Sequence, residues 1–190
     1  MPLLRIDDPA LAYDGACDRA RAILEAYEPA DADQADARAC MLEFLREHPR
    51  DGHLRECEPG HLTASAIILH PDGRRGLFTH HAKLDRWLQL GGHCDGDGNL
   101  PGVALREAIE ESGIEDLAID PVPVDLDIHL IPDRRGEPAH LHLDTRFRVV
   151  AGRDDFAVSD ESHDLAWLTL EELRERGDGS VLRLAGLLMG

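Results

Sequence analysis

Apolar and polar residues alternate in several short stretches of the second half of the chain, and this period of two predicts β-strands. The run 62–70, LTASAIILH, is followed by the turn 71–73 and by the segment 76–81, GLFTHH, so we expect a β-hairpin here. Further strands are expected at 88–90, 122–130, 139–150 and 164–168, and a helix at 170–176 leads into a leucine-rich tail.

The first part of the chain has a helical pattern. Residues 17–26 and 35–47 place apolar side chains at mixed helical spacing, and Pro29 with the acidic run 31–36 marks a turn between them. Such a helical pair is more typical of packing or dimerisation than of substrate contact. We therefore divide the chain into an N-terminal helical extension, 1–58, and an α/β domain, 59–190.

A glycine-rich bend separates the strand at 88–90 from a helix that ends near residue 112. Pro101 is typical of a helix start and Gly113 of a helix end. At about 3.6 residues per turn, Glu107, Glu110 and Glu111 fall on one narrow face of this helix. The opposite face is apolar and can pack on a sheet.

Three carboxylates on one stripe repel by only a few tenths of a kcal/mol per pair, so a solvated acidic face would explain them by themselves. The bend changes this interpretation, because it brings flexible backbone from Gly91 and Gly92 and the carboxylates of Asp95 and Asp97 towards the same stripe. Clustered hard oxygen ligands favour Mg²⁺ or Mn²⁺, which reaches phosphates through carboxylates and water.

The segment 92–114 resembles the signature of the Nudix hydrolases, G-x5-E-x7-R-E-U-x-E-E-x-G-U, in which U is a bulky aliphatic residue. The matching residues are Gly92, Arg106, Glu107, Glu110, Glu111, Gly113 and Ile114, with Ala108 as a small U. Residue 98 departs from the signature, because it is Gly where the family has Glu; Asp95 and Asp97 are the nearest substitutes. The resemblance covers residues 59–190. Within the family, this sequence is similar to a bacterial, MutT-like branch.

The resemblance implies an α/β/α sandwich with a mixed sheet, to which this chain adds its N-terminal helical extension. It also implies hydrolysis of a phosphoanhydride bond in a nucleoside diphosphate linked to another group. The implied Mg²⁺ or Mn²⁺ ligands are Glu107, Glu110 and Glu111, with Glu107 as ligand or base, Gly92 through its backbone carbonyl, and Asp97. Arg106 is expected to orient these carboxylates, and Glu161 is either a loop carboxylate near the metal or a solvated acid.

Candidate substrate groups lie on both sides of the signature. Lys83 and Arg86 belong to a small basic cluster before the bend, and His93 lies within it. His140, His142 and Asp144 alternate and therefore point to one side of a strand, where a transition metal, a substrate contact and hydrogen-bonded strand histidines are all open interpretations. Asp127 and His129 raise the same question.

Composition limits the partners. With 20 Lys and Arg against 38 Asp and Glu, the net charge is −18, which argues against binding a nucleic-acid polymer. An anionic substrate then needs bound metal and a few local cations. The four cysteines are widely spaced and predict reduced thiols, with Cys94 a small buried residue. No targeting or membrane-spanning pattern is present, so we expect a cytoplasmic protein. We expect its substrate to be a nucleotide-type diphosphate, and the sequence leaves open whether the chain forms a homodimer.

Two other functions compete with hydrolysis. Gly98 favours a catalytically weak or inactive Nudix-fold module that binds a nucleotide without cleaving it. An isomerase of the isopentenyl diphosphate type shares the fold, but the sequence lacks a supporting active-site Cys and Glu arrangement. The sequence does not identify the substrate, since a fold does not transmit specificity.

Overall fold

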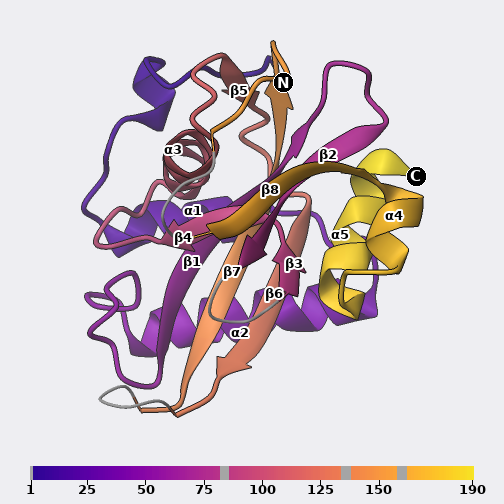
Figure 1. Ribbon diagram of the computed structural model, residues 1–190. Helices are drawn as coiled ribbons and strands as arrows, with labels where there is room; N and C mark the ends of the chain where they lie inside the picture. Colours follow the sequence, from indigo (N-terminus) through magenta and orange to yellow (C-terminus); the bar gives the residue numbers. More distant parts are fainter. Residues whose placement is uncertain (1, 82–85, 134–137, 158–161) are drawn as a thin grey trace.

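A mixed β-sheet runs through the centre of the molecule (Figure 1). The computed structural model describes residues 2–81, 86–133, 138–157 and 162–190. The strands are β1 (Gly60–Leu69), β2 (Arg75–His81), β3 (Arg86–Leu88), β4 (Leu90–His93), β5 (Leu117–Ile119), β6 (Asp125–Ile131), β7 (His140–Ala151) and β8 (Ser162–Thr169). The helices are the 3₁₀ turn η1 (Pro9–Leu11), α1 (Cys17–Ala26), α2 (Ala32–Glu47), α3 (Leu100–Ser112), α4 (Leu170–Arg174) and α5 (Gly179–Met189).

Strand β1 organises the sheet. It pairs in parallel with β7 over its whole length, from Gly60 beside Leu141 to Leu69 beside Val150. Its other edge pairs antiparallel with β4 and, at its end, with β2. Strands β5 and β6 add to β7, and β3 and β8 add to β2.

The two faces of the sheet differ in chemistry. Even-numbered residues of β1 and odd-numbered residues of β7, such as Leu62 and Phe147, are buried in one apolar core with α1, α2 and α3. The other face carries a smaller apolar core, around Ile67 and Phe78, which α4 and α5 cover. Figure 1 shows α4 and α5 on one side of the sheet and α3 on the other. The α/β/α sandwich with a mixed sheet is therefore confirmed.

The N-terminal helices share the main core. Leu24, Met41 and Leu45 are buried in the same cluster as residues of β1 and α3. The backbone of Leu4 also exchanges two hydrogen bonds of 2.8 Å with Ile119 of β5. The boundary at residue 58 stays a prediction, but the extension is not a separately packed unit in this structure.

The structure confirms the predicted hairpin, the other predicted strands and the two helices of the extension. It differs from the prediction at the glycines before α3, at β5 and in the C-terminal tail. The expected strand at 88–90 is two strands, β3 and β4, and Gly91 and Gly92 lie within β4. Strand β5 has three residues, which is too short to give a periodic signal. The leucine-rich tail forms α5, which Asp178 caps by accepting two backbone hydrogen bonds. None of the described helices combines the length and apolar composition that crossing a lipid bilayer requires.

A buried ion network joins the sheet to α5. The Arg146 guanidinium is almost fully buried and lies 2.9 Å from a carboxylate oxygen of Asp144 and 3.1 Å from oxygens of both Asp125 and Asp127. Arg183 of α5 binds Asp125 and Asp127 from the other side. Because buried charges are costly unless paired, Arg146 compensates three carboxylates in this polar layer.

Replacing Arg146 by Ala should therefore destabilise the fold strongly. Removing one partner of a buried ion pair typically costs about 3–5 kcal/mol, since the other partner is left uncompensated. The matched control is Arg148→Ala, because Arg148 is partly exposed and pairs with a single carboxylate, that of Asp120 at 3.0 Å; it should cost about 1 kcal/mol or less. Urea unfolding of both variants measures the difference, and equal losses would contradict a central role for Arg146.

Candidate active site

Helix α3 presents the signature carboxylates. Its first turn, which contains Pro101, is buried, and it ends at Gly113, whose φ of 67° and N–H bond to the Ile109 carbonyl form a left-handed cap. The helix is buried on the side that contacts β1 and β4. The three predicted ligands lie beyond this buried side: Glu107 and Glu111 are half-buried and Glu110 is exposed.

Gly92 and Glu107 are in direct contact. A Cβ atom built on Gly92 would collide with the Glu107 carboxylate, so this carboxylate lies against the backbone of β4. Gly92 pairs with Ala64 of β1 and is therefore fixed in the sheet. A side chain at residue 92 would displace the Glu107 carboxylate; a role of Gly92 in metal binding stays a prediction.

Asp97 and Arg106 form hydrogen bonds that stabilise the bend before α3. Asp97 is 1% exposed, and its Oδ1 accepts hydrogen bonds from the backbone N–H groups of Asp14 (3.1 Å) and Asn99 (2.9 Å). Its Oδ2 accepts one from Arg106 at 3.2 Å. Arg106 thus pairs with Asp97, and these contacts favour a structural role for both residues; metal binding by Asp97 stays a prediction.

Gly98 is packed against the N-terminal segment. Its N–H donates to the Asp14 carbonyl at 2.7 Å, and a Cβ atom at this position would collide with the carbonyl oxygen of Ala16. The neighbouring Asn99 side chain donates to the carbonyls of Ala10 and Ala12. The backbone of the extension therefore occupies the space into which a side chain at residue 98 would point.

Arg55 is a cation of this region that the sequence did not indicate. Its guanidinium binds both carboxylate oxygens of Asp95, at 2.7 and 2.6 Å. This pairing raises the pKa of Arg55, and the negative charge of Glu107 raises it further, so Arg55 lies near the acidic stripe. Asp95 and Glu107 are both distant from Arg55 in sequence, so no spacing pattern predicts that Arg55 belongs to this region.

The structure gathers five histidine rings at one end of the sheet. His61 of β1, His93 of β4 and His140 of β7 surround His142 of β7, and His129 of β6 lies on its other side. Burial lowers the pKa of His61 to about 4 and that of His142 to about 2, and the neighbouring imidazoles add to both shifts. These two rings are therefore neutral at physiological pH.

Asp144 does not belong to this histidine cluster. Although it points to the same side of β7 as predicted, its carboxylate accepts hydrogen bonds from Thr63 (3.2 Å), Ser65 (2.7 Å) and Arg146 (2.9 Å). Asp127 is likewise held by Ser180 and the arginine network. Both carboxylates are structural in this arrangement.

The remaining predicted residues are dispersed. Arg86 lies 3.6 Å from Asp178, at the start of α5. Lys83 and Glu161 lie outside the described residues. Cys94 is buried as expected, and burial raises the pKa of its thiol.

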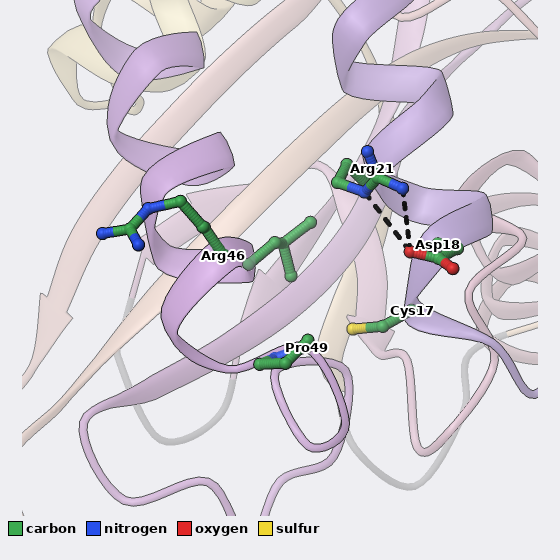
Figure 2. Close-up of a pocket in the computed structure, with 6 residues that line it drawn as sticks. Cys17, Asp18, Arg21, Arg46 and Pro49 are labelled. Carbon is green, nitrogen blue, oxygen red and sulfur yellow. Dashed lines mark hydrogen bonds and ion pairs between the residues drawn. The ribbon is translucent and has the colours of Figure 1, made fainter.

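A surface pocket between α1 and α2 contains none of the predicted site residues. Figure 2 shows that Cys17, Asp18 and Arg21 line one side of it and Arg46 and Pro49 the other, with Arg21 bound to Asp18 at 3.0 Å. Its charged groups pair within single helices. We assign it no role.

The structure contains two kinds of possible metal-binding group: compact groups with histidine, and the carboxylates of α3. Within the part of the chain that the structure describes, tight groups of ligand atoms are His61 with His140 and His142, and His48 with Asp51 and Cys57. The three glutamates of α3 form a more open set. Such a set fits Mg²⁺ or Mn²⁺, because these ions are usually bound by one or two carboxylates and several waters.

Comparison with known proteins identifies the family to which the α/β domain is similar. The model of the NUDIX domain matches residues 59–184. The E. coli dihydroneopterin triphosphate pyrophosphohydrolase is similar with a TM-score of 0.55 and 16% identity, over 67% of this chain and 94% of that one. A MutT NUDIX hydrolase from Burkholderia pseudomallei gives a TM-score of 0.50 and 21% identity, over 68% and 98%. At these identities the structures show a shared fold alone, and no curated protein matches the sequence.

The packing of Gly98 makes a prediction for the substitution that restores the signature. Gly98→Glu should displace the N-terminal segment and lower the free energy of unfolding by about 1–3 kcal/mol, the usual cost of overpacking. Gly186→Glu is the control, since Gly186 has open space around its Cβ position. Limited proteolysis of residues 2–16 and urea unfolding check this; a Gly98→Glu protein as resistant as the control would contradict the packing.

Proposed function

The chain belongs to the Nudix family, and from this premise we propose that it is a divalent-metal-dependent pyrophosphohydrolase acting on a nucleoside diphosphate-linked small molecule. The observation that carries the proposal is the stripe of Glu107, Glu110 and Glu111 on α3, in register with the family signature, with the Glu107 carboxylate in contact with Gly92. The proposed reaction is attack of water on a phosphoanhydride bond, as expected from the sequence.

The proposed ion ligands are Glu110 and Glu111 first, and Glu107 as a further ligand or as the base. Bound there, Mg²⁺ or Mn²⁺ would neutralise phosphate oxygens and favour deprotonation of a water molecule. Glu107 is constrained, because its carboxylate lies against the β4 backbone at Gly92. A fixed carboxylate is suited to positioning a ligand or a water molecule for attack.

Positive charge at the site comes from few residues. The net charge of −18 repels a diphosphate, so local cations must offset it. Arg55 is positioned near Glu107 by its two bonds to Asp95 and is half-exposed, which supports a contact between its guanidinium and a substrate phosphate. Arg106 is held by the buried Asp97 and supports the bend.

The departure at Gly98 does not by itself favour the inactive alternative. The backbone of Ala16 fills the space beside Gly98, and the guanidinium of Arg106 is paired with Asp97. The absence of a glutamate at this position therefore leaves no uncompensated arginine and no cavity in the bend. Nucleotide binding without turnover is kept as the outcome that would favour the alternative.

The proposal predicts large effects from isosteric neutralisation. Glu110→Gln and Glu111→Gln should each lower kcat by at least about 10²-fold, the scale found when an electrostatic contributor to catalysis is removed. Glu115→Gln, an exposed glutamate just beyond α3, is the control and should keep full activity. Release of phosphate or nucleoside monophosphate is measured with nucleoside triphosphates, ADP-ribose, dinucleoside polyphosphates, NADH and nucleotide sugars, in Mg²⁺ or Mn²⁺.

Near-normal kinetics in both variants would remove these glutamates from the site. Nucleotide binding by the unaltered protein without turnover of any member of the panel would instead support the regulatory module. The two outcomes are distinguishable, because the first requires an active enzyme and the second excludes one.

A further inference from the structure

The histidine cluster contains a compact set of nitrogen ligands that the proposed hydrolysis does not use. The parallel register of β1 and β7 places His61 beside His142, and the period of two places His140 on the same face. Ring centroids lie 4.9 Å apart for His61 with His140, 4.9 Å for His61 with His142, and 5.2 Å for His140 with His142. Each residue offers a ring nitrogen within 4.8 Å of the other two.

These spacings match a coordination sphere. Nitrogens bound to one tetrahedral Zn²⁺ ion at about 2.0 Å lie about 3.3 Å apart. The Nε2 atoms of His140 and His142 are 3.3 Å apart. A ring nitrogen of His61 lies within 4.8 Å of both.

The protonation state of His140 is suited to a metal ligand. Its Nδ1 lies 2.9 Å from the carbonyl oxygen of Pro138, which can only accept, so Nδ1 carries the proton. In the neutral ring, Nε2 then offers its lone pair towards His142. A ligand histidine that donates its other N–H to a backbone carbonyl is the usual outer-shell arrangement of metal sites.

His61 supplies an independent observation. It is 3% exposed, and neither ring nitrogen has a hydrogen-bond partner of normal geometry in the described structure. Leaving a buried polar group unsatisfied typically costs about 1–3 kcal/mol. A cation between the three rings would give this imidazole a partner of normal geometry.

We propose that His61, His140 and His142 bind a transition-metal ion of the Zn²⁺ class, at a centre separate from the glutamate stripe of α3. Imidazole nitrogens favour Zn²⁺, whereas the carboxylates of α3 favour Mg²⁺ or Mn²⁺, so the two centres differ in the ion they select. His129 is not part of this compact ligand set, which consists of His61, His140 and His142. The ion would join β1 to β7 at the end of the sheet.

Cobalt substitution tests this centre directly. After treatment with a chelator, the full chain is titrated with Co²⁺, and the strong visible absorption of tetrahedral Co²⁺ should rise to one equivalent per chain and disappear when Zn²⁺ is added. His140→Ala should weaken binding at least about 10-fold, the least that even an outer-shell change costs. His129→Ala is the matched control from the same cluster and should bind normally.

A second comparison separates the two centres. The double variant Glu110→Gln, Glu111→Gln should retain the tetrahedral Co²⁺ spectrum, so failure of the hydrolase proposal leaves this one intact. No tetrahedral spectrum in the unaltered protein, an unchanged affinity in His140→Ala, or loss of the spectrum in the glutamate variant would overturn the proposal.

A measurement without ligand substitutions covers the case in which His140→Ala does not fold. In the unaltered protein, Zn²⁺ should slow the reaction of diethylpyrocarbonate with His140 and His142, followed residue by residue by mass spectrometry. The same Zn²⁺ should leave the reaction of the exposed His129 unchanged. Equal reaction rates of His140 and His142 with and without Zn²⁺ would overturn the proposal.

Discussion

The parallel pairing of β1 with β7 is the constraint on which the rest of the structure depends. Over ten residues of β1 it aligns apolar positions of both strands on one face; on the other face it aligns polar positions at the start of β1 and the smaller apolar core at its end. Because side chains alternate with a period of two, a shift of one residue would move His142 and Asp144 into the apolar core. The register therefore fixes the surface on which α3 packs and, on the opposite face, the polar layer.

The distribution of cations explains how so acidic a chain folds and still accepts an anion. Arg146 and Arg183 neutralise the buried aspartates of the polar layer, and Arg106 is held by Asp97. These charges are thus paired with carboxylates that would be expensive to leave unpaired in the interior. In the described part of the chain Arg55, itself paired with Asp95, is a cation near the glutamates of α3, and we expect a divalent cation to supply the further positive charge that a diphosphate requires.

Local patterns in the sequence were sufficient for most elements and for the glutamate stripe. Glu107, Glu110 and Glu111 share a face because one helix contains them all, and helical spacing is a property of adjacent residues. The pairs His61 with His142, Arg55 with Asp95 and Gly98 with Ala16 have no such signal, because each joins segments that are distant in sequence. The histidine pattern of β7 was visible, but its third partner, His61, required the register of the sheet.

The single departure from the family signature and the N-terminal extension are explained by one contact. The bend before α3 carries Gly98, whose N–H binds the Asp14 carbonyl and whose missing Cβ leaves room for the Ala16 carbonyl. Asp97 binds the Asp14 N–H with one oxygen and Arg106 with the other. A glutamate at position 98 and the extension in its present path would require the same space. The extension therefore occupies the space of a signature side chain and supports the bend, and its position is coupled to that of the helix that carries the glutamates.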